Sequence, residues 1–339
     1  MFSALIVAVL AGMIVAAVAY KIIFAPNVQL ADRESMHLYI TRDSSYAEVL
    51  ELLKKEEIVK NLNSFDRLAQ RKNYPNRVMP GRYLIRNQMS NNELINLLRS
   101  GEQDPVRLTF TNIRTEEDLA GSIARQLEMD STAILHHIRS EGVIRESGLN
   151  TPNIKLLFIP NTYEVYWTIS PGQLVARMQR EFDAFWNATR RERAQQIGLT
   201  PEEVGILASI VQSETNKMDE MPRIAGVYIN RLSRNMPLQA CPTVIYAIGD
   251  FSITRLLNDQ LDTQSPYNTY LHAGLPPGPI NLPEPTAIDA VLNYETHSYL
   301  FFSASPEFNG YHVFARTHRE HLRNARTYQQ KLNEMRIFR

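Results

Sequence analysis

An apolar run at the start of the chain predicts its first element. No charged residue occurs over 2–19, and further apolar residues follow Lys21 as far as Phe24. About 20 apolar residues are enough for a helix to cross a bilayer, so we predict a transmembrane anchor over 1–25. A cleaved signal peptide is the alternative, because residues 17–19 (Ala-Val-Ala) resemble a signal cleavage site.

The pattern over 26–104 predicts a small unit of mixed secondary structure. A polar linker is expected near 31–35, and strand-like alternation and helix-capping pairs follow it. The expected elements are a strand at 38–41, helices that begin after Ser45 and Ser64, a strand at 82–85 and a helix that begins after Ser90. The same order of strand, helix, helix, strand and helix is expected again over 105–190. We therefore hypothesise a diverged internal repeat, which rests on the order of elements and not on matching residues.

The remaining region, 191–339, predicts helices followed by a hairpin. Thr200, Pro201 and Glu203 form a strong helix start, with an N-cap residue, a proline at the first helical position and a capping-box glutamate. The expected C-terminal elements are a buried strand at 299–304, its hairpin partner at 311–314 and a charged helix at 319–335. Helices and short strands are thus mixed along the chain, and we predict the α+β class.

One carboxylate lies on the apolar face of the helix that begins at Pro201. Leu207, Ile210 and Val211 form an apolar stripe at helical spacing, and Glu214 falls on the same stripe. Burial of that face would desolvate Glu214 and raise its pKa. A carboxylic acid that is still protonated near neutral pH is what a general acid needs to cleave a glycosidic bond. A solvated or ion-paired glutamate is the structural alternative.

Composition and motifs argue against several classes of function. The 339 residues include 36 basic and 36 acidic side chains, and without a long basic run we expect no nucleic-acid partner. The single cysteine, Cys241, excludes an intrachain disulfide and a cysteine-rich zinc site. His318 and His321 are spaced to share a ligand on a helix, but the chain lacks an H-E-x-x-H motif. We therefore expect no metal and no cofactor, and we interpret the histidine pair as a solvated helix face.

Several ordered blocks of sequence resemble the YceG-like endolytic murein transglycosylase family. The blocks lie at 80–83 (PGRY), 160–163 (PNTY), 208–215 (ASIVQSET), 228–232 (YINRL), 236–239 (MPLQ), 242–244 (PTV), 267–270 (YNTY), 274–280 (GLPPGPI), 299–302 (YLFF) and 312–317 (HVFART). The resemblance therefore covers nearly the whole chain. It implies a single anchor in the inner (cytoplasmic) membrane, a LysM-like subdomain over 26–104 and an α+β region over 105–339 on the periplasmic side. The catalytic core would lie within 191–339.

The resemblance also implies a substrate and a mechanism. The substrate would be peptidoglycan glycan strands, cut between MurNAc and GlcNAc so that 1,6-anhydroMurNAc ends form. Glu214 would protonate the bridging oxygen and then act as base on the muramic C6 hydroxyl, so that a second carboxylate is not required. The candidates to bind the sugars are Asn230, Gln239, Thr243, Tyr267, Asn268 and His312. Each of these side chains could instead satisfy protein groups.

Two residues depart from what is usual in that family. An acidic residue usually stands at the position of Cys241, and its loss would weaken a hydrogen-bond network at the site. A second glutamate often stands where this chain has Gln212, which favours Glu214 as the catalyst. Two other functions stay open: a non-catalytic peptidoglycan-binding scaffold of the cell-wall synthesis machinery, and a plain hydrolase that leaves reducing ends. Association with cell-wall synthases is expected from the resemblance alone.

Overall fold

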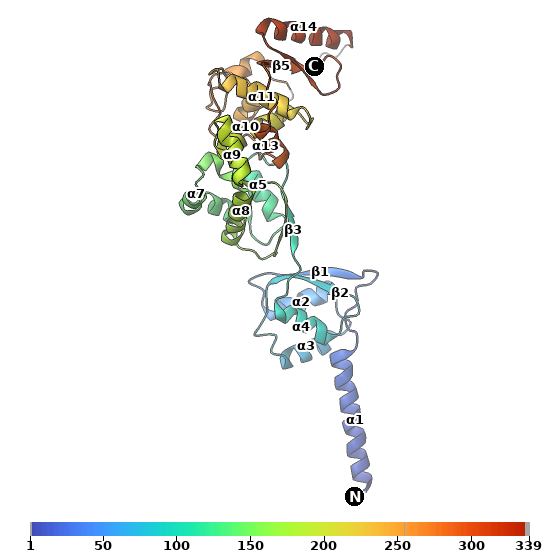
Figure 1. Cartoon of the computed structure of the whole chain (residues 1–339). Coiled ribbons are helices and arrows are strands. Elements are labelled where there is room, and N and C mark those ends of the chain that lie inside the picture. Colours follow the sequence, from blue (N-terminus) through green and yellow to red (C-terminus); the bar gives the residue numbers. More distant parts are fainter. Residues whose placement is uncertain (1, 254, 336–339) are drawn as a thin grey trace. The chain divides into compact units, whose positions relative to one another are not determined.

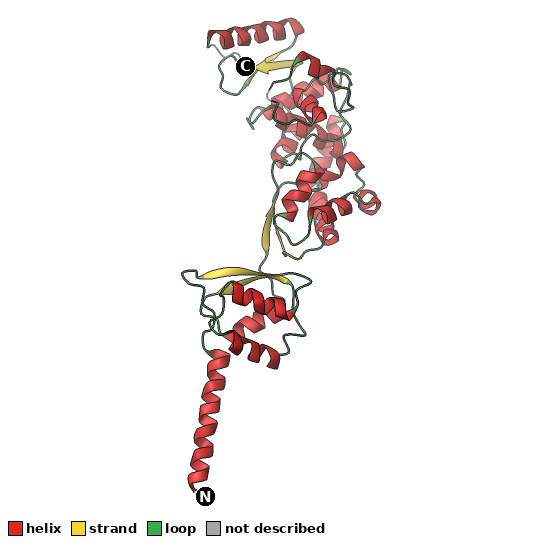
Figure 2. Ribbon diagram, turned by 180° about the vertical axis from the view of Figure 1, so that it is seen from behind, coloured by secondary structure: helices red, strands yellow, loops and turns green. Residues whose placement is uncertain are grey.

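The computed structural model describes residues 2–253 and 255–335, which form helices and short two-stranded sheets (Figures 1 and 2). The α+β class predicted from the sequence is confirmed. The chain divides into two compact units. The first unit comprises Met1–Leu108, Arg125–Met129 and Tyr163–Ser170, and the second comprises Thr109–Ala124, Asp130–Thr162 and Pro171–Arg339. The domain boundaries and the LysM-like character drawn from the sequence remain predictions.

Helix α1 (Phe2–Phe24) is the predicted apolar N-terminal helix, and its segment Leu5–Phe24 is long and apolar enough to cross a membrane. The polar linker expected after it is wrong. Val28 and Leu30 are buried in the core of the first unit, so the chain enters that core within a few residues of α1. Residues 31–35 form an exposed turn that leads into the first strand, and their polarity reflects this exposure.

The rest of the first unit confirms the expected order of strand, helix, helix, strand and helix. Its elements are β1 (Ser35–Ile40), α2 (Tyr46–Lys55), α3 (Leu62–Arg71), β2 (Gly81–Arg86) and α4 (Asn91–Ser100). Strands β1 and β2 are antiparallel. The side chains of Ser45 and Ser90 accept hydrogen bonds from the third residue of α2 and α4, as their capping boxes predict. A second pair of strands, β3 (Val106–Thr109) and β4 (Thr162–Val165), belongs mostly to this unit.

The second unit is mainly helical. Its elements are α5 (Glu116–Ala124), α6 (Ser131–Ile138), α7 (Glu141–Ser147), the 3-10 helix η1 (Thr151–Leu157), α8 (Pro171–Phe185), α9 (Ala188–Ile197), α10 (Pro201–Glu214), α11 (Met221–Leu232), α12 (Cys241–Ile248), the 3-10 helix η2 (Asn258–Asp262), α13 (Pro285–Leu292), β5 (Phe301–Ala304), β6 (His312–Ala315) and α14 (His318–Glu334). Between β3 and α8 the expected order recurs, with α7 and η1 inserted before β4. The internal repeat remains a hypothesis, because it rests on this order alone.

Helix α10 is the centre of the second unit. Every residue over 204–211 is buried, because α9, α11, α12 and α13 pack around the helix. Gly205 allows η1 to come close, since a Cβ at this position would lie 2.9 Å from a methyl group of Leu156. Thr200 caps the start of α10 as the sequence predicts. The helix is therefore a fixed support for the residue at its C-terminal end, Glu214.

A hairpin and a helix follow at the C-terminus of the described chain. Strands β5 and β6 are antiparallel, with Phe301 opposite Ala315 and Ala304 opposite His312, which confirms the predicted hairpin. The strand predicted as buried is only half-buried, because it forms part of a pocket wall. Helix α14 packs against both strands, and its bounds agree with the charged helix expected over 319–335.

Candidate active site

Glu214 is the last residue of α10, and its side chain leaves the core there. Thr215 is in an extended conformation and ends the helix, and its hydroxyl oxygen accepts a hydrogen bond from the amide of Lys217 at 3.0 Å. The Glu214 residue is half-buried, in contrast to residues 204–211 of the same helix, which are all buried. In the fold, Glu214 therefore lies at the edge of the core.

The surroundings of Glu214 favour its neutral form. Burial raises the pKa of its carboxyl group, and a hydrogen bond from Tyr228 and the nearby charge of His312 lower that pKa only in part. The phenolic oxygen of Tyr228 lies 2.6 Å from Oε1 of Glu214. Burial also raises the pKa of Tyr228 well above its usual value, so the Tyr228 hydroxyl stays protonated. It therefore acts as the donor of the hydrogen bond to Glu214.

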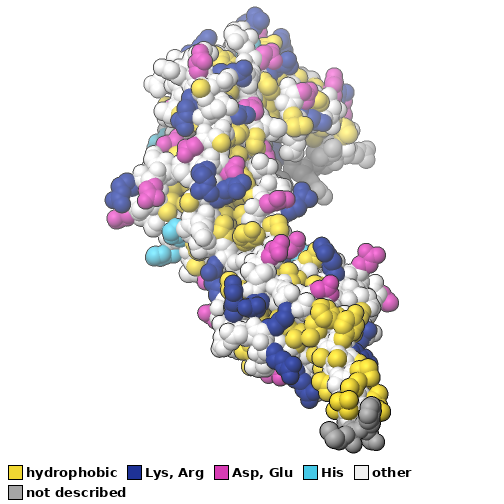
Figure 3. All heavy atoms as spheres, turned by 60° about the horizontal axis from the view of Figure 1, so that its bottom comes forward, with side chains coloured by type: hydrophobic (Ala, Val, Ile, Leu, Met, Phe, Trp, Pro, Cys, Tyr) yellow, Lys and Arg dark blue, Asp and Glu magenta, His cyan; other side chains and the backbone are white. Residues whose placement is uncertain are grey.

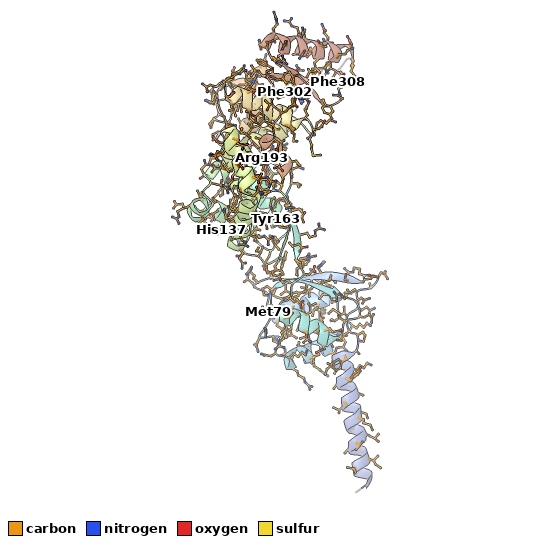
Figure 4. The ribbon with its side chains drawn as sticks, viewed as in Figure 1. Met79, His137, Tyr163, Arg193, Phe302 and Phe308 are labelled. Carbon is orange, nitrogen blue, oxygen red and sulfur yellow. The ribbon has the colours of Figure 1, made fainter. Side chains whose placement is uncertain are left out.

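Glu214 lies between two pockets and lines both of them. The Arg231 pocket, with an empty volume of about 800 Å³, is lined by Tyr228, Arg231, Gln239, Cys241, Phe302 and His321 among others. The Lys217 pocket, with an empty volume of about 990 Å³, is lined by Thr215, Lys217, Phe308, Tyr311, His312 and Tyr328 among others. Figure 4 labels one aromatic residue from each pocket, Phe302 on β5 and Phe308 in the loop after it. Among the described residues that line either pocket, Glu214 is the single carboxyl residue.

A buried glutamate holds His312 at the wall of the Lys217 pocket. Oε1 of Glu220 accepts the backbone amide of His312 at 2.7 Å, and Oε2 lies 2.8 Å from its Nδ1. Only 4% of Glu220 is exposed. Because a carboxylate can only accept here, Nδ1 carries the hydrogen, and Nε2 is the ring nitrogen left for the pocket. The ring of His312 meets that of Phe302 edge to face at 5.2 Å, so its orientation is fixed on two sides.

Arg231 shapes the wall of the other pocket. Its guanidinium group donates to the backbone oxygens of Leu300, Pro237 and Leu238 at 2.7–2.9 Å. It also donates to Oε1 of Gln239 at 3.2 Å. Arg231 therefore ties strand β5 to the segment that precedes α12, and it fixes the side chain of Gln239.

A family model described as "YceG-like family" matches residues 38–327. This chain belongs to the YceG-like family. A Bacillus subtilis (strain 168) protein named endolytic murein transglycosylase is 26% identical over 324 residues, which cover 91% of this chain and 88% of that protein. A protein of the same name from Streptococcus pneumoniae serotype 2 (strain D39 / NCTC 7466) is 28% identical over 84% of this chain, but the match spans only 57% of its own length.

A solved structure supports the fold of this YceG-like protein. The crystal structure of a yceG-like protein from Listeria monocytogenes matches it with a TM-score of 0.58 at 24% sequence identity. The match covers 86% of this chain and 98% of the listerial chain. At this level of identity the comparison concerns the fold alone.

The structure brings three of the predicted site residues to the two pockets, namely Glu214, Gln239 and His312. The other four line neither pocket in the part of the chain that is described. Asn230 and Asn268 each donate to two backbone carbonyl oxygens at 2.8–3.0 Å. Thr243 is fully buried and donates to a backbone oxygen at 2.7 Å, and the ring of Tyr267 packs on that of Tyr246. These four side chains support the loops around the site, and a direct contact with sugars remains a prediction for them.

Cys241 begins α12 and faces the Arg231 pocket. It is exposed, and its sulfur lies 3.2 Å from the hydroxyl oxygen of Tyr270. A neutral thiol and a phenol therefore occupy the position where an acidic residue was expected from the family resemblance.

The two histidines of α14 are not equivalent, and the interpretation of both as a solvated face is wrong. His318 is exposed, but His321 is half-buried and its ring stacks on Phe301 at 5.4 Å between centroids. Both line the Arg231 pocket. Burial, followed by the positive charges of His318 and Arg231, lowers the pKa of His321, so this imidazole is neutral near pH 7.

Sequence reasoning missed Glu220, Arg231 and His321 as site residues. Glu220 follows Glu214 by six residues, and its partner is 92 positions further along the chain. The pairing depends on the hairpin folding back over the start of α11. The sequence alone does not show that the hairpin places His312 next to Glu220, so it could not reveal this pair.

Proposed function

We propose that this protein is a lytic transglycosylase that cleaves peptidoglycan glycan strands, with Glu214 as general acid and then as base. The observation that carries the proposal is the position of Glu214 as the carboxyl residue shared by the two pockets. A polymer that runs from one pocket to the other would expose its linking oxygen to this carboxyl group. Two curated relatives named endolytic murein transglycosylase support the same substrate class.

In the first step, the neutral Glu214 donates its proton to the oxygen that joins MurNAc C1 to the next GlcNAc. The C1–O bond breaks, the GlcNAc leaves with a hydroxyl group, and positive charge develops at C1. The raised pKa of Glu214 supports this role, since burial shifts the carboxyl group toward its protonated form. The acetamido oxygen of the same sugar can stabilise the charge at C1.

In the second step, the Glu214 carboxylate accepts the proton of the C6 hydroxyl of MurNAc. The C6 oxygen then bonds to C1 and closes a 1,6-anhydro ring, so no water is added and Glu214 regains its proton. A hydrolase that uses two carboxylates would need a second acid within about 5–10 Å. Glu214 is the single carboxyl residue among the described residues that line the pockets, and the lytic reaction requires only one.

Neutral and cationic donors line the two pockets and suit a polymer rich in amide and hydroxyl oxygens. We propose that Gln239, His312 and His321 bind the sugar amides and hydroxyls, because their side chains line the pockets. Phe302 and Tyr311 supply flat apolar surfaces of the kind that sugar rings pack against. The remaining candidates would act indirectly by holding the loops.

We also propose that α1 anchors the chain in the cytoplasmic membrane and that both units lie on its outer side, where peptidoglycan is. The first unit is proposed to be LysM-like, because the antiparallel strands β1 and β2 enclose two helices in the chain order strand, helix, helix, strand. Partnership with cell-wall synthases stays a prediction.

The proposal is tested by the products that the full-length protein releases from purified peptidoglycan. Mass spectrometry distinguishes an anhydro end from a reducing end by the mass of one water. Anhydro ends are the expected product. Reducing ends would contradict the lytic mechanism and favour a hydrolase, and tight binding to peptidoglycan without new ends would favour the scaffold.

A further inference from the structure

Hydrogen bonds from buried asparagines connect the end of α1 to the first unit. Nδ2 of Asn91 donates to the backbone oxygen of Ile22 at 2.9 Å, and Nδ2 of Asn27 donates to Oδ1 of Asn91 at 2.6 Å. The amide of Asn61 donates to Oδ1 of Asn27 at 3.0 Å. Asn27 and Asn91 are both buried. These hydrogen bonds hold the end of α1 against the core of the first unit.

Helix α3 lies at the base of the unit, beside the end of α1. Asn61 caps the start of α3, and α1 contacts both α3 and α4. Phe65, Leu68 and Ala69 form the buried side of α3. Figure 1 shows α3 below α2 and α4, at the level where α1 enters the unit. The exposed side of α3 consequently faces the direction in which α1 extends.

This exposed side is basic. Arg67 and Arg71 of α3 are exposed, as is Lys60 just before the helix, and we call these three residues the α3 basic face. The acidic residue of the helix, Asp66, is held by the hydroxyl of Tyr46 at 2.8 Å. Figure 3 views the unit from the end where α1 extends, and dark blue Lys and Arg side chains gather beside the yellow apolar helix there.

We propose that the α3 basic face rests on the anionic phospholipid headgroups of the bilayer that α1 crosses. The proposal depends on α1 being a membrane anchor. Lys60 is held near the end of α1, because its backbone amide donates a hydrogen bond of 2.8 Å to the backbone oxygen of Asn27, three residues after α1 ends. Salt screens the attraction between exposed charges and anionic lipid beyond roughly 8–10 Å, so the proposal requires the α3 basic face to lie at the headgroups. Anionic lipid would thereby fix the orientation of the first unit relative to the membrane surface.

The experiment uses the full chain in lipid nanodiscs of phosphatidylcholine, with or without phosphatidylglycerol. A fluorophore is attached to Gln70→Cys on α3, in a Cys241→Ser background, and nitroxide-bearing headgroups serve as the quencher. The test variant carries Lys60→Gln, Arg67→Gln and Arg71→Gln. The matched control variant removes three exposed arginines elsewhere in the same unit, namely Arg42, Arg107 and Arg125.

We expect quenching to be about threefold or more stronger in discs with phosphatidylglycerol, and the test variant alone to lose this difference. Equal quenching in both lipids, or an equal loss in the control variant, would overturn the proposal. If the chain does not enter discs at all, the proposal that α1 is a membrane anchor is also wrong. If the chain enters discs but quenching does not depend on the lipid, only the proposed contact of the α3 basic face is wrong. If soluble polyphosphate protects the face while anionic discs do not, the partner is an anionic wall polymer and the proposal is wrong.

Discussion

The hydroxyl group of Tyr228 donates a hydrogen bond of 2.6 Å to Oε1 of Glu214. This bond stabilises the charged form of Glu214, whereas burial stabilises its neutral form, and burial has the larger effect. The pKa of Glu214 thus stays raised, but less than burial alone would raise it. An acid that must first give and then take back one proton benefits from such a balance.

The substitution Tyr228→Phe tests this balance. Phenylalanine keeps the ring contact with Phe302 but removes the hydrogen bond that lowers the pKa of Glu214. We expect the pKa of Glu214 to rise further, so the alkaline limb of the pH profile of kcat/KM moves to higher pH. The measurement is the initial rate of anhydro-end formation across a pH series. An unshifted limb, with activity lower by the same factor at every pH, would mean that Tyr228 is only structural.

The raised pKa of Glu214 also predicts a dependence of stability on pH. An ordinary glutamate has a pKa of about 4.3 in an unfolded chain, below its value in the fold. The contribution of Glu214 to the free energy of unfolding is therefore fully present below its unfolded pKa. This contribution is lost as the pH rises through its higher pKa in the folded protein. The variant Glu214→Gln lacks this loss, so its melting temperature should exceed that of the wild type by a gap that widens from about pH 4 upward. A gap that narrows with pH would contradict a raised pKa.

The contact between Glu220 and His312 predicts a role for a residue outside both pockets. In Glu220→Gln the buried charge is lost and the imidazole is no longer held by a carboxylate. A hydrogen bond to a charged group contributes about 1.5–3 kcal/mol, so activity should fall roughly 10- to 100-fold. The neighbouring change Asp219→Asn is the control, because Asp219 contacts the exposed hydroxyl of Tyr311 instead. Equal effects of the two changes on the rate would argue against a positioning role for Glu220.

The single cysteine offers a chemical test of the Arg231 pocket. Cys241 is the only cysteine of the chain, and it is exposed at the pocket wall together with Glu214. Alkylation with a maleimide should fill part of the pocket and lower activity about 10-fold or more, since small displacements of substrate cost this much. A Cys241→Ser variant treated in the same way should keep its activity. Full activity after complete modification, as verified by intact mass, would show that the substrate does not use this pocket.

Local sequence patterns were sufficient to predict the helices that position Glu214. Capping boxes at Ser45, Ser90 and Thr200 are confirmed, because each depends on residues three positions apart. The period of the apolar residues located Glu214 on the buried side of α10. The sequence could not predict that the core would end at this residue, because the pockets are made by β5, β6 and α14.

The features that the sequence did not predict depend on contacts between distant segments. Glu220 and Arg231 satisfy partners on the hairpin and its surrounding loops, 69 to 92 positions away. The polarity of residues 31–35 suggested a linker, although Val28 and Leu30 just before them are core residues. In both cases the role of the segment is set by the distant residues that fold against it, which the local pattern does not contain.

The central claim is that Glu214 supplies the proton, and a matched pair of glutamine variants tests it most directly. Glu284 also has a pKa raised by burial, but it lines neither pocket among the described residues. Glu214→Gln and Glu284→Gln therefore make the same chemical change inside and outside the site. On purified peptidoglycan, the rate of anhydro-end formation should fall about 100- to 10,000-fold in Glu214→Gln and stay near the wild-type rate in Glu284→Gln. Anhydro ends formed at an undiminished rate by Glu214→Gln would contradict the account.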